Sequence, residues 1–286
     1  MVVYGALGCC VLDGFVIEPH WISNDHLLLS EHPSLRVVHI SDIHYKGVRS
    51  YLVRIVASVN AMAPDVVCFT GDIVEDARYL DEALDILSKI NVPLYGVPGN
   101  HEYWCGASFD RIGDCFRKTG GGWLVDSSVV TLKGRLVITG RSGTEIDTRR
   151  VASEFAMPGR KTEWNPVQTS ITGSPALPET IAPSVVEHGN PATIVPGVKR
   201  ILLTHYPLVV ESIKGATYDL ILSGHSHGGQ VRLPFIGALI VPFGVNGYQM
   251  GTYSTPIGPL HVSSGLGTFY MPVRFLCRPE ITLIEI

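Results

Sequence analysis

The feature that most constrains the fold is a regular alternation of apolar runs and amphipathic segments in the first third of the chain. Apolar runs occupy residues 35–40, 66–69 and 92–97, while residues 51–62 and 79–90 between them carry apolar side chains at helical spacing. This order and spacing of strands and helices are typical of a parallel βαβαβ unit. The sequence therefore predicts an α/β protein built on a parallel sheet.

Polar side chains follow each of these three runs. Asp42 and His44 come after the first run, Asp72 after the second, and Asn100 and His101 after the third. Because the carboxyl ends of parallel strands meet at one edge of a sheet, we expect these side chains to lie close together.

The second half of the chain adds three histidines in the same kind of position. An apolar run at residues 200–204 ends at His205, and a second at 219–223 leads into a Gly-His-Ser-His motif that contains His225 and His227. Two histidines separated by one residue point to the same face of a strand, so His225 and His227 can serve one site. The flanking glycines favour an irregular turn at this position.

The remaining apolar runs predict a second sheet. Residues 129–132 and 136–139 have the pattern of an antiparallel hairpin, and shorter runs lie at 231–233, 260–263 and 281–286. We therefore expect an α/β fold of two packed mixed β-sheets flanked by helices.

Two segments fall outside this pattern. Residues 140–197 hold seven of the 19 prolines, and a structureless loop of that length is uncommon inside a compact domain. We interpret this segment as a largely disordered insertion, with a functional lid as the alternative. The expected division of the chain is thus an apolar N-terminal segment at 1–34 and one domain at 35–286.

The N-terminal segment is apolar but short. Residues 1–16 contain one charged side chain, Asp13, and fall below the roughly 20 residues that span a bilayer. No Lys or Arg precedes Arg36, so a signal peptide is not favoured. The segment is expected to pack on the core or to lie on a membrane surface, and a truncated membrane anchor stays open as an alternative.

Bulk properties restrict the class of protein. A formal charge of −4 gives no basic field, so nucleic acid is not favoured as a partner. The six cysteines form no Cys-x-x-Cys pair, which indicates reduced thiols and a cytoplasmic protein. Contact with the inner membrane from that side remains part of the expectation.

The polar residues at the predicted strand ends suit a pair of metal ions. They offer more nitrogen and oxygen donors than one tetrahedral site uses, and no cysteine takes part, so structural zinc fits poorly. Two divalent ions that share a bridging carboxylate fit better, and the mixed imidazole and carboxylate donors favour Mn, Fe, Zn or Co over Mg alone. The candidate residues are Asp42, His44, Asp72, Asn100, His101, His205, His225 and His227.

Five motifs together resemble the calcineurin-like metallophosphoesterase superfamily, in the family's order. They are Asp42-x-His44, Gly71-Asp72, Gly99-Asn100-His101-Glu102, Thr204-His205 and Gly224-His225-Ser226-His227. The resemblance covers residues 35–286 and leaves 140–197 unmatched. The Glu18-Pro19 pair and the tail at 265–280 further resemble a bacterial branch that contains the YkuE and YaeI phosphodiesterases and the chlamydial-type UDP-2,3-diacylglucosamine pyrophosphatases.

The resemblance implies a role for each motif residue. One metal would be held by Asp42, His44 and His227, the other by Asn100, His205 and His225, and Asp72 would bridge them. A hydroxide shared by the two ions would attack phosphorus, with His101 as general acid beside the leaving oxygen. Glu102 would cap the following helix, which we favour, or orient His101.

The function that follows is hydrolysis of a phosphodiester or pyrophosphate bond, with manganese among the candidate metals. A nucleotide-lipid such as UDP-2,3-diacylglucosamine, in lipid A biosynthesis, is the finer expectation. A phosphomonoesterase is one alternative. A non-catalytic scaffold is another, although a scaffold is expected to lose ligands and this chain keeps them all. We expect the apolar stretch at 235–243 to form a buried strand rather than an exposed rim for an acyl chain or a membrane.

Overall fold

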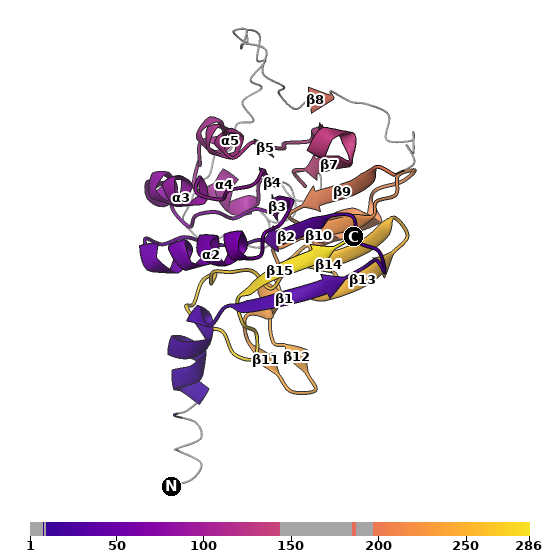
Figure 1. Ribbon diagram of the computed structural model, residues 1–286. Helices are drawn as coiled ribbons and strands as arrows, with labels where there is room; N and C mark the ends of the chain where they lie inside the picture. The colour runs from indigo at the N-terminus through magenta and orange to yellow at the C-terminus, as the bar shows by residue number, and fades with distance from the viewer. Residues whose placement is uncertain (1–7, 9, 144–184, 187–196) are drawn as a thin grey trace.

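The computed structural model describes residues 8, 10–143, 185–186 and 197–286, and its core is a pair of packed β-sheets (Figure 1). The order of the first sheet is β1 (Ser23–Leu28), β15 (Glu280–Glu285), β2 (Arg36–Ile40), β3 (Val66–Phe69), β4 (Leu94–Gly96) and β5 (Gly122–Trp123). Strands β2 to β5 pair in parallel, whereas β15 runs antiparallel to β2. The predicted βαβαβ unit is confirmed as β2 to β4 with the two helices between them.

Helices cover the outer face of this sheet, on the left in Figure 1. Val38 and Ile40 of β2 join one buried cluster with residues of the helices, whereas Val37 joins a second cluster between the sheets. This alternation follows from the two-residue period of a strand. The helices are α2 (Arg49–Ala61), α3 (Leu80–Leu87), α4 (Asn100–Trp104) and α5 (Phe109–Lys118), and short 3₁₀ turns include η3 (Ala77–Tyr79), η4 (Leu132–Gly134), η5 (Pro207–Glu211) and η6 (His227–Gly229).

The second sheet is also mixed. Its central strands β14, β10, β9 and β7 are parallel, and β6 and β7 form the predicted antiparallel hairpin. The expected fold of two packed mixed sheets flanked by helices is thus confirmed. The order is β13 (Gly251–Thr255), β14 (Gly258–Val262), β10 (Leu220–Ser223), β9 (Lys199–Thr204), β7 (Leu136–Arg141), β6 (Ser128–Thr131) and β8 (Val185–Val186).

The N-terminal segment contributes to the first sheet, since β1 pairs in parallel with β15. Before it, Asp13–Ile17 form a helical turn, η1, and Glu18–His20 a 3₁₀ turn, η2. Phe15 and Val16 of η1 are exposed, whereas Gly14 is buried against residues 273–275. Among the described residues, none of the helices has both the length and the apolar character to cross a bilayer.

Two further sequence expectations concern irregular regions. Most of the expected insertion at 140–197 lies outside the described residues. The prediction of a buried strand at 235–243 is wrong. The segment lies at the exposed turn of a small ribbon made by β11 (Arg232–Leu233) and β12 (Gly237–Ala238), and most of its large apolar side chains are exposed. Phe235 lies at that turn and is fully exposed.

Candidate metal centre

All predicted metal-centre residues lie just beyond the carboxyl ends of strands in the two sheets. Since β2, β3, β4, β9 and β10 run parallel within their sheets, their ends converge on one edge of the sandwich. The side chains are buried, with His225 partly exposed. They are Asp42 and His44 after β2, Asp72 after β3, Asn100 and His101 after β4, His205 after β9, and His225 and His227 after β10.

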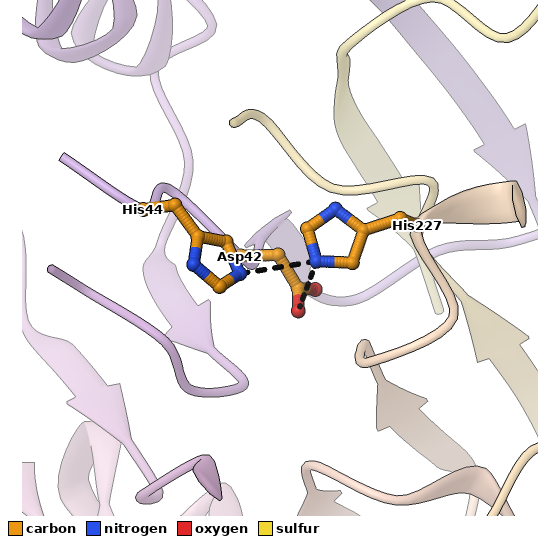
Figure 2. A group of neighbouring side chains, drawn as sticks. All are labelled: Asp42, His44 and His227. Atoms are coloured by element: carbon orange, nitrogen blue, oxygen red, sulfur yellow. Dashed lines mark hydrogen bonds and ion pairs between the residues drawn. The ribbon is translucent and has the colours of Figure 1, made fainter. Parts of the chain in front are cut away.

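Asp42, His44 and His227 form the first group of donors (Figure 2). The Nε2 atoms of His44 and His227 lie 3.0 Å apart, and His227 Nε2 lies 3.5 Å from Asp42 Oδ1. Ligands about 2.1 Å from a shared ion are separated by about 3.0 Å in an octahedron and about 3.4 Å in a tetrahedron. The spacing of these three atoms therefore fits a cation between them.

Asn100, His205 and His225 form a second group with similar spacing. The Nε2 atom of His205 lies 3.0 Å from Asn100 Oδ1 and 3.0 Å from His225 Nδ1. An amide oxygen supplies a donor without adding charge. This group therefore offers two imidazoles and one neutral oxygen to a single cation.

Asp72 lies between the two groups. Its Oδ2 atom is 3.4 Å from His44 Nε2 in the first group and 3.4 Å from His205 Nε2 in the second. Its other oxygen, Oδ1, accepts a hydrogen bond of 2.8 Å from the backbone N–H of His101. One carboxylate oxygen is thus within reach of both groups, which is the arrangement needed for a bridging ligand.

Backbone carbonyls orient two of the imidazoles through the ring nitrogen that faces away from the centre. His205 Nδ1 lies 2.6 Å from the carbonyl oxygen of Thr70, and His225 Nε2 lies 2.7 Å from that of Phe243. A carbonyl can only accept, so the nitrogen facing it carries the proton. The opposite nitrogen of each ring then presents its lone pair to the centre, as a metal ligand requires.

Glu75 orients the third imidazole, and the sequence reasoning missed it. Its Oε2 atom lies 2.8 Å from His44 Nδ1 and 3.5 Å from His101 Nδ1. A carboxylate behind a histidine fixes the ring and raises its basicity as a ligand. The available signal was its position three residues after Asp72, where the loop turns back towards His44.

The backbone at the site adopts conformations that most side chains avoid. The φ angles are 50° at Asp42, 42° at His44, 64° at Asp72, 67° at His225 and 51° at His227. Left-handed geometry costs an L-residue about 1–2 kcal/mol, although Asp and His tolerate it better than most. These turns explain how both histidines of the Gly-His-Ser-His motif reach one centre, as predicted.

Two glycines allow the loops to approach each other. A Cβ atom at Gly71 would lie 2.5 Å from the backbone nitrogen of Gly99 and 2.7 Å from His205 Nδ1. A Cβ atom at Gly99 would overlap Oδ1 of Asp72. Any side chain at either position would displace the bridging carboxylate or its neighbours.

Glu102 joins the β3 and β4 loops from beneath. Its carboxylate accepts backbone N–H groups of Gly99 at 2.7 Å, Asp72 at 2.9 Å and Ile73 at 2.6 Å. The bond to Gly99 caps the start of α4, as favoured from the sequence. The other two bonds hold the backbone of Asp72 and Ile73, a contact that sequence spacing did not indicate. Burial and the nearby Asp72 raise the pKa of Glu102 to about 7.

The electrostatics of the centre lower the pKa of the Asp72 carboxyl and the pKa of three histidines, His101, His225 and His227. Burial opposes ionisation of Asp72, but His205, His101 and His44 outweigh it and hold its pKa well below the usual range. Burial lowers the pKa of His101 to about 4 and that of His227 well below its ordinary value. Burial acts on His44 in the same direction, but hydrogen bonds to nearby carboxylates raise its pKa to about 9.

Aromatic rings surround His101 at the edge of the centre. Its ring centroid lies 4.5 Å from His44, 5.0 Å from Trp104 and 5.3 Å from Phe269. Trp104 is more than half exposed, so this side of His101 faces the surface of the molecule. The His101 ring therefore lies between His44 of the first donor group and the exposed Trp104.

Comparisons with known proteins agree with this geometry. The family model for calcineurin-like phosphoesterases matches residues 35–229. The uncharacterized metallophosphoesterase YkuE of Bacillus subtilis is 28% identical, over 94% of this chain and 87% of its own. Phosphodiesterase YaeI of Escherichia coli is 34% identical over 30% of this chain and 32% of its own. The UDP-2,3-diacylglucosamine pyrophosphatase LpxG of Chlamydia muridarum is 26% identical, over 88% and 83%.

Proposed function

Because this chain belongs to the calcineurin-like phosphoesterase family and is a metallophosphoesterase, we propose that it hydrolyses a phosphodiester or pyrophosphate bond at a dinuclear metal centre. Asp42, His44 and His227 would hold one divalent ion, and Asn100, His205 and His225 would hold the other. Asp72 would be the ligand shared between them.

The observation that carries the proposal is the position of Asp72 Oδ2, at 3.4 Å from an imidazole nitrogen of each group. Two ions held this way would supply Lewis acidity and lower the pKa of a shared water to near neutrality. Mn, Fe, Zn and Co are the candidates, because imidazole and carboxylate donors suit them.

His101 is the residue that handles the proton of the leaving group. Its backbone is tied to Asp72, its Nδ1 faces Glu75 at 3.5 Å, and its ring lies against Trp104 and Phe269. Burial lowers the pKa of this ring, and an anionic phosphoryl group beside it would favour the protonated form. The protonated imidazole could then donate a proton to the departing oxygen or stabilise the charge that develops on it.

For the natural substrate we propose a nucleotide-lipid with a pyrophosphate bond, such as UDP-2,3-diacylglucosamine, which would place the reaction in lipid A biosynthesis. The likeness to LpxG over most of both chains supports this choice. The aromatic surroundings of His101 support it too, since they offer apolar contacts beside the reacting bond. Such a substrate implies an enzyme on the cytoplasmic side of the inner membrane.

The test compares three substrates on one preparation supplied with Mn²⁺, and then with Zn²⁺ or Co²⁺. They are bis(p-nitrophenyl) phosphate, p-nitrophenyl phosphate and UDP-2,3-diacylglucosamine. Preference for the lipid nucleotide is the expected result. Turnover of the simple diester alone would exclude the lipid nucleotide as the natural substrate. Preference for the monoester would identify the chain as a phosphomonoesterase. Inactivity on all three substrates with metal bound would indicate a scaffold.

A further inference from the structure

Exposed apolar side chains gather on one face formed by three chain segments. We call it the apolar face and define it by residues 11–17, 233–241 and 270–276. Figure 1 shows η1 and the β11–β12 ribbon projecting beyond the sheets at the lower end of the molecule. Its most exposed members are Phe235, Ile240, Tyr270, Ile236, Met271 and Val16. Contiguous exposed apolar surface of this kind marks an interaction site.

Backbone hydrogen bonds join the three segments into one structure. The N–H of Arg274 donates to the carbonyl of Gly14 at 2.9 Å, which ties the third segment to the first. The N–H of Arg232 donates to the carbonyl of Phe275 at 2.9 Å, which ties β11 to the third segment. The apolar side chains are therefore presented together rather than by independent loops.

The turn of the ribbon is built to expose a large ring. The N–H of Ile236 donates to the carbonyl of Leu233 at 3.3 Å, and Pro234 and Phe235 occupy the two central positions. The φ angle of Phe235 is 68°, in a position where turns that begin with proline normally have glycine. Phenylalanine at this position costs stability, and its ring is fully exposed, so contacts within the described chain do not offset the cost.

Basic and indole side chains follow the first and third segments closely in the chain. The guanidinium of Arg278 lies 4.1 Å from the ring centroid of the exposed Trp21, just after η2. Arg54 donates to the carbonyl of His20 at 3.4 Å, in the same place. Apolar tips backed by Trp and Arg match the layers of a membrane interface, where acyl chains lie beneath anionic headgroups.

We propose that the apolar face docks the protein on the surface of a bilayer that contains anionic lipid. Phe235, Ile236 and Ile240 enter the acyl region, while Arg278 and Arg54 contact lipid phosphates. The charge pattern and the convex, projecting ribbon favour a deformable lipid surface over a preformed groove on a protein. The proposal does not depend on the identity of the substrate.

The experiment measures partition of the purified chain onto vesicles of phosphatidylcholine with about 30% phosphatidylglycerol. The test variant carries Phe235→Gly, Ile236→Ser and Ile240→Ser together, and should bind at least about tenfold more weakly. A control variant with Leu28→Thr and Val53→Ser changes exposed apolar residues elsewhere and should bind within about twofold of the parent chain. Pure phosphatidylcholine or high salt should weaken binding of the parent chain.

A further variant separates membrane binding from folding. Phe235→Gly alone relieves the backbone at the turn, so its melting temperature should rise or stay the same while vesicle binding falls. Equal binding by the triple variant, or no binding by the parent chain, would overturn the proposal. So would a dimer of the parent chain that the triple variant abolishes without any vesicle binding. Hydrolysis of bis(p-nitrophenyl) phosphate without vesicles should be the same in all variants, which separates this proposal from the proposed catalysis.

Discussion

The metal centre and the apolar face hold their side chains in opposite ways. At the metal centre most of the imidazoles and carboxylates are buried, and partners from distant parts of the chain fix several of them, as Glu75 fixes His44 and Thr70 fixes His205. On the apolar face the side chains project outward from short turns, and backbone bonds alone join the segments. The difference indicates that position within a fraction of an ångström matters at the centre. Exposed surface is what matters on the face.

Loss of the Asp72 carboxylate should have the largest effect on this comparison. Asp72→Ala should reduce turnover by at least about 10³-fold, because both donor groups lose a shared ligand. Bound metal, measured by elemental analysis after gel filtration, should fall as well. Near-normal activity with two ions retained would show that Asp72 is not the bridge.

Removing His101 should separate binding of metal from chemistry. His101→Ala should lower turnover by about 10²- to 10⁴-fold, as expected for a general acid, while both ions stay bound. Steady-state kinetics and metal analysis on the same preparation check this. An unchanged rate would disprove the general-acid role.

A smaller effect is expected at Glu75, which contacts the Nδ1 atoms of His44 and His101. Glu75→Gln should lower activity or metal affinity by about 10- to 100-fold, the usual cost of losing a partner behind a ligand. Because glutamine keeps the shape, the fold should be unaffected, and the melting temperature serves as the control. A loss as large as that of Asp72→Ala would mean that Glu75 is itself a ligand.

The smallest effect is expected on the apolar face. Ile236→Ser should change the free energy of unfolding by no more than about 0.5 kcal/mol, because the side chain is largely exposed. Denaturant unfolding measures this. A cost of several kcal/mol would mean that the face packs against another part of the chain and would erase the contrast with the metal centre.

Sequence reasoning predicted the centre well because strand ends carry most of its information. An apolar run followed by Asp42 or Asp72 fixes both the strand and the edge at which the carboxylate lies. Glu75 was missed because its contact with His44 depends on left-handed turns at His44 and Asp72, which no periodic pattern reveals.

The apolar face shows where prediction from the sequence fails. The stretch at 235–243 reads as a buried strand because apolar composition is the same for a core and for a surface that contacts lipid. Strand β1 was also missed. It lies at the edge of the first sheet and includes Asp25 and His26, so its apolar alternation is weak.

The pairing of β15 has a consequence for how the chain reaches this structure. β15 lies between β1 and β2, so the first sheet is continuous only after the last residues of the chain have been inserted beside strands made near the beginning. During synthesis, the backbone N–H and C=O groups of β2 that face β15 stay unpaired until residues roughly 240 positions downstream have been made. Contacts of such long range make folding slow. They also leave an open strand edge for the whole time of translation, which a chaperone can recognise.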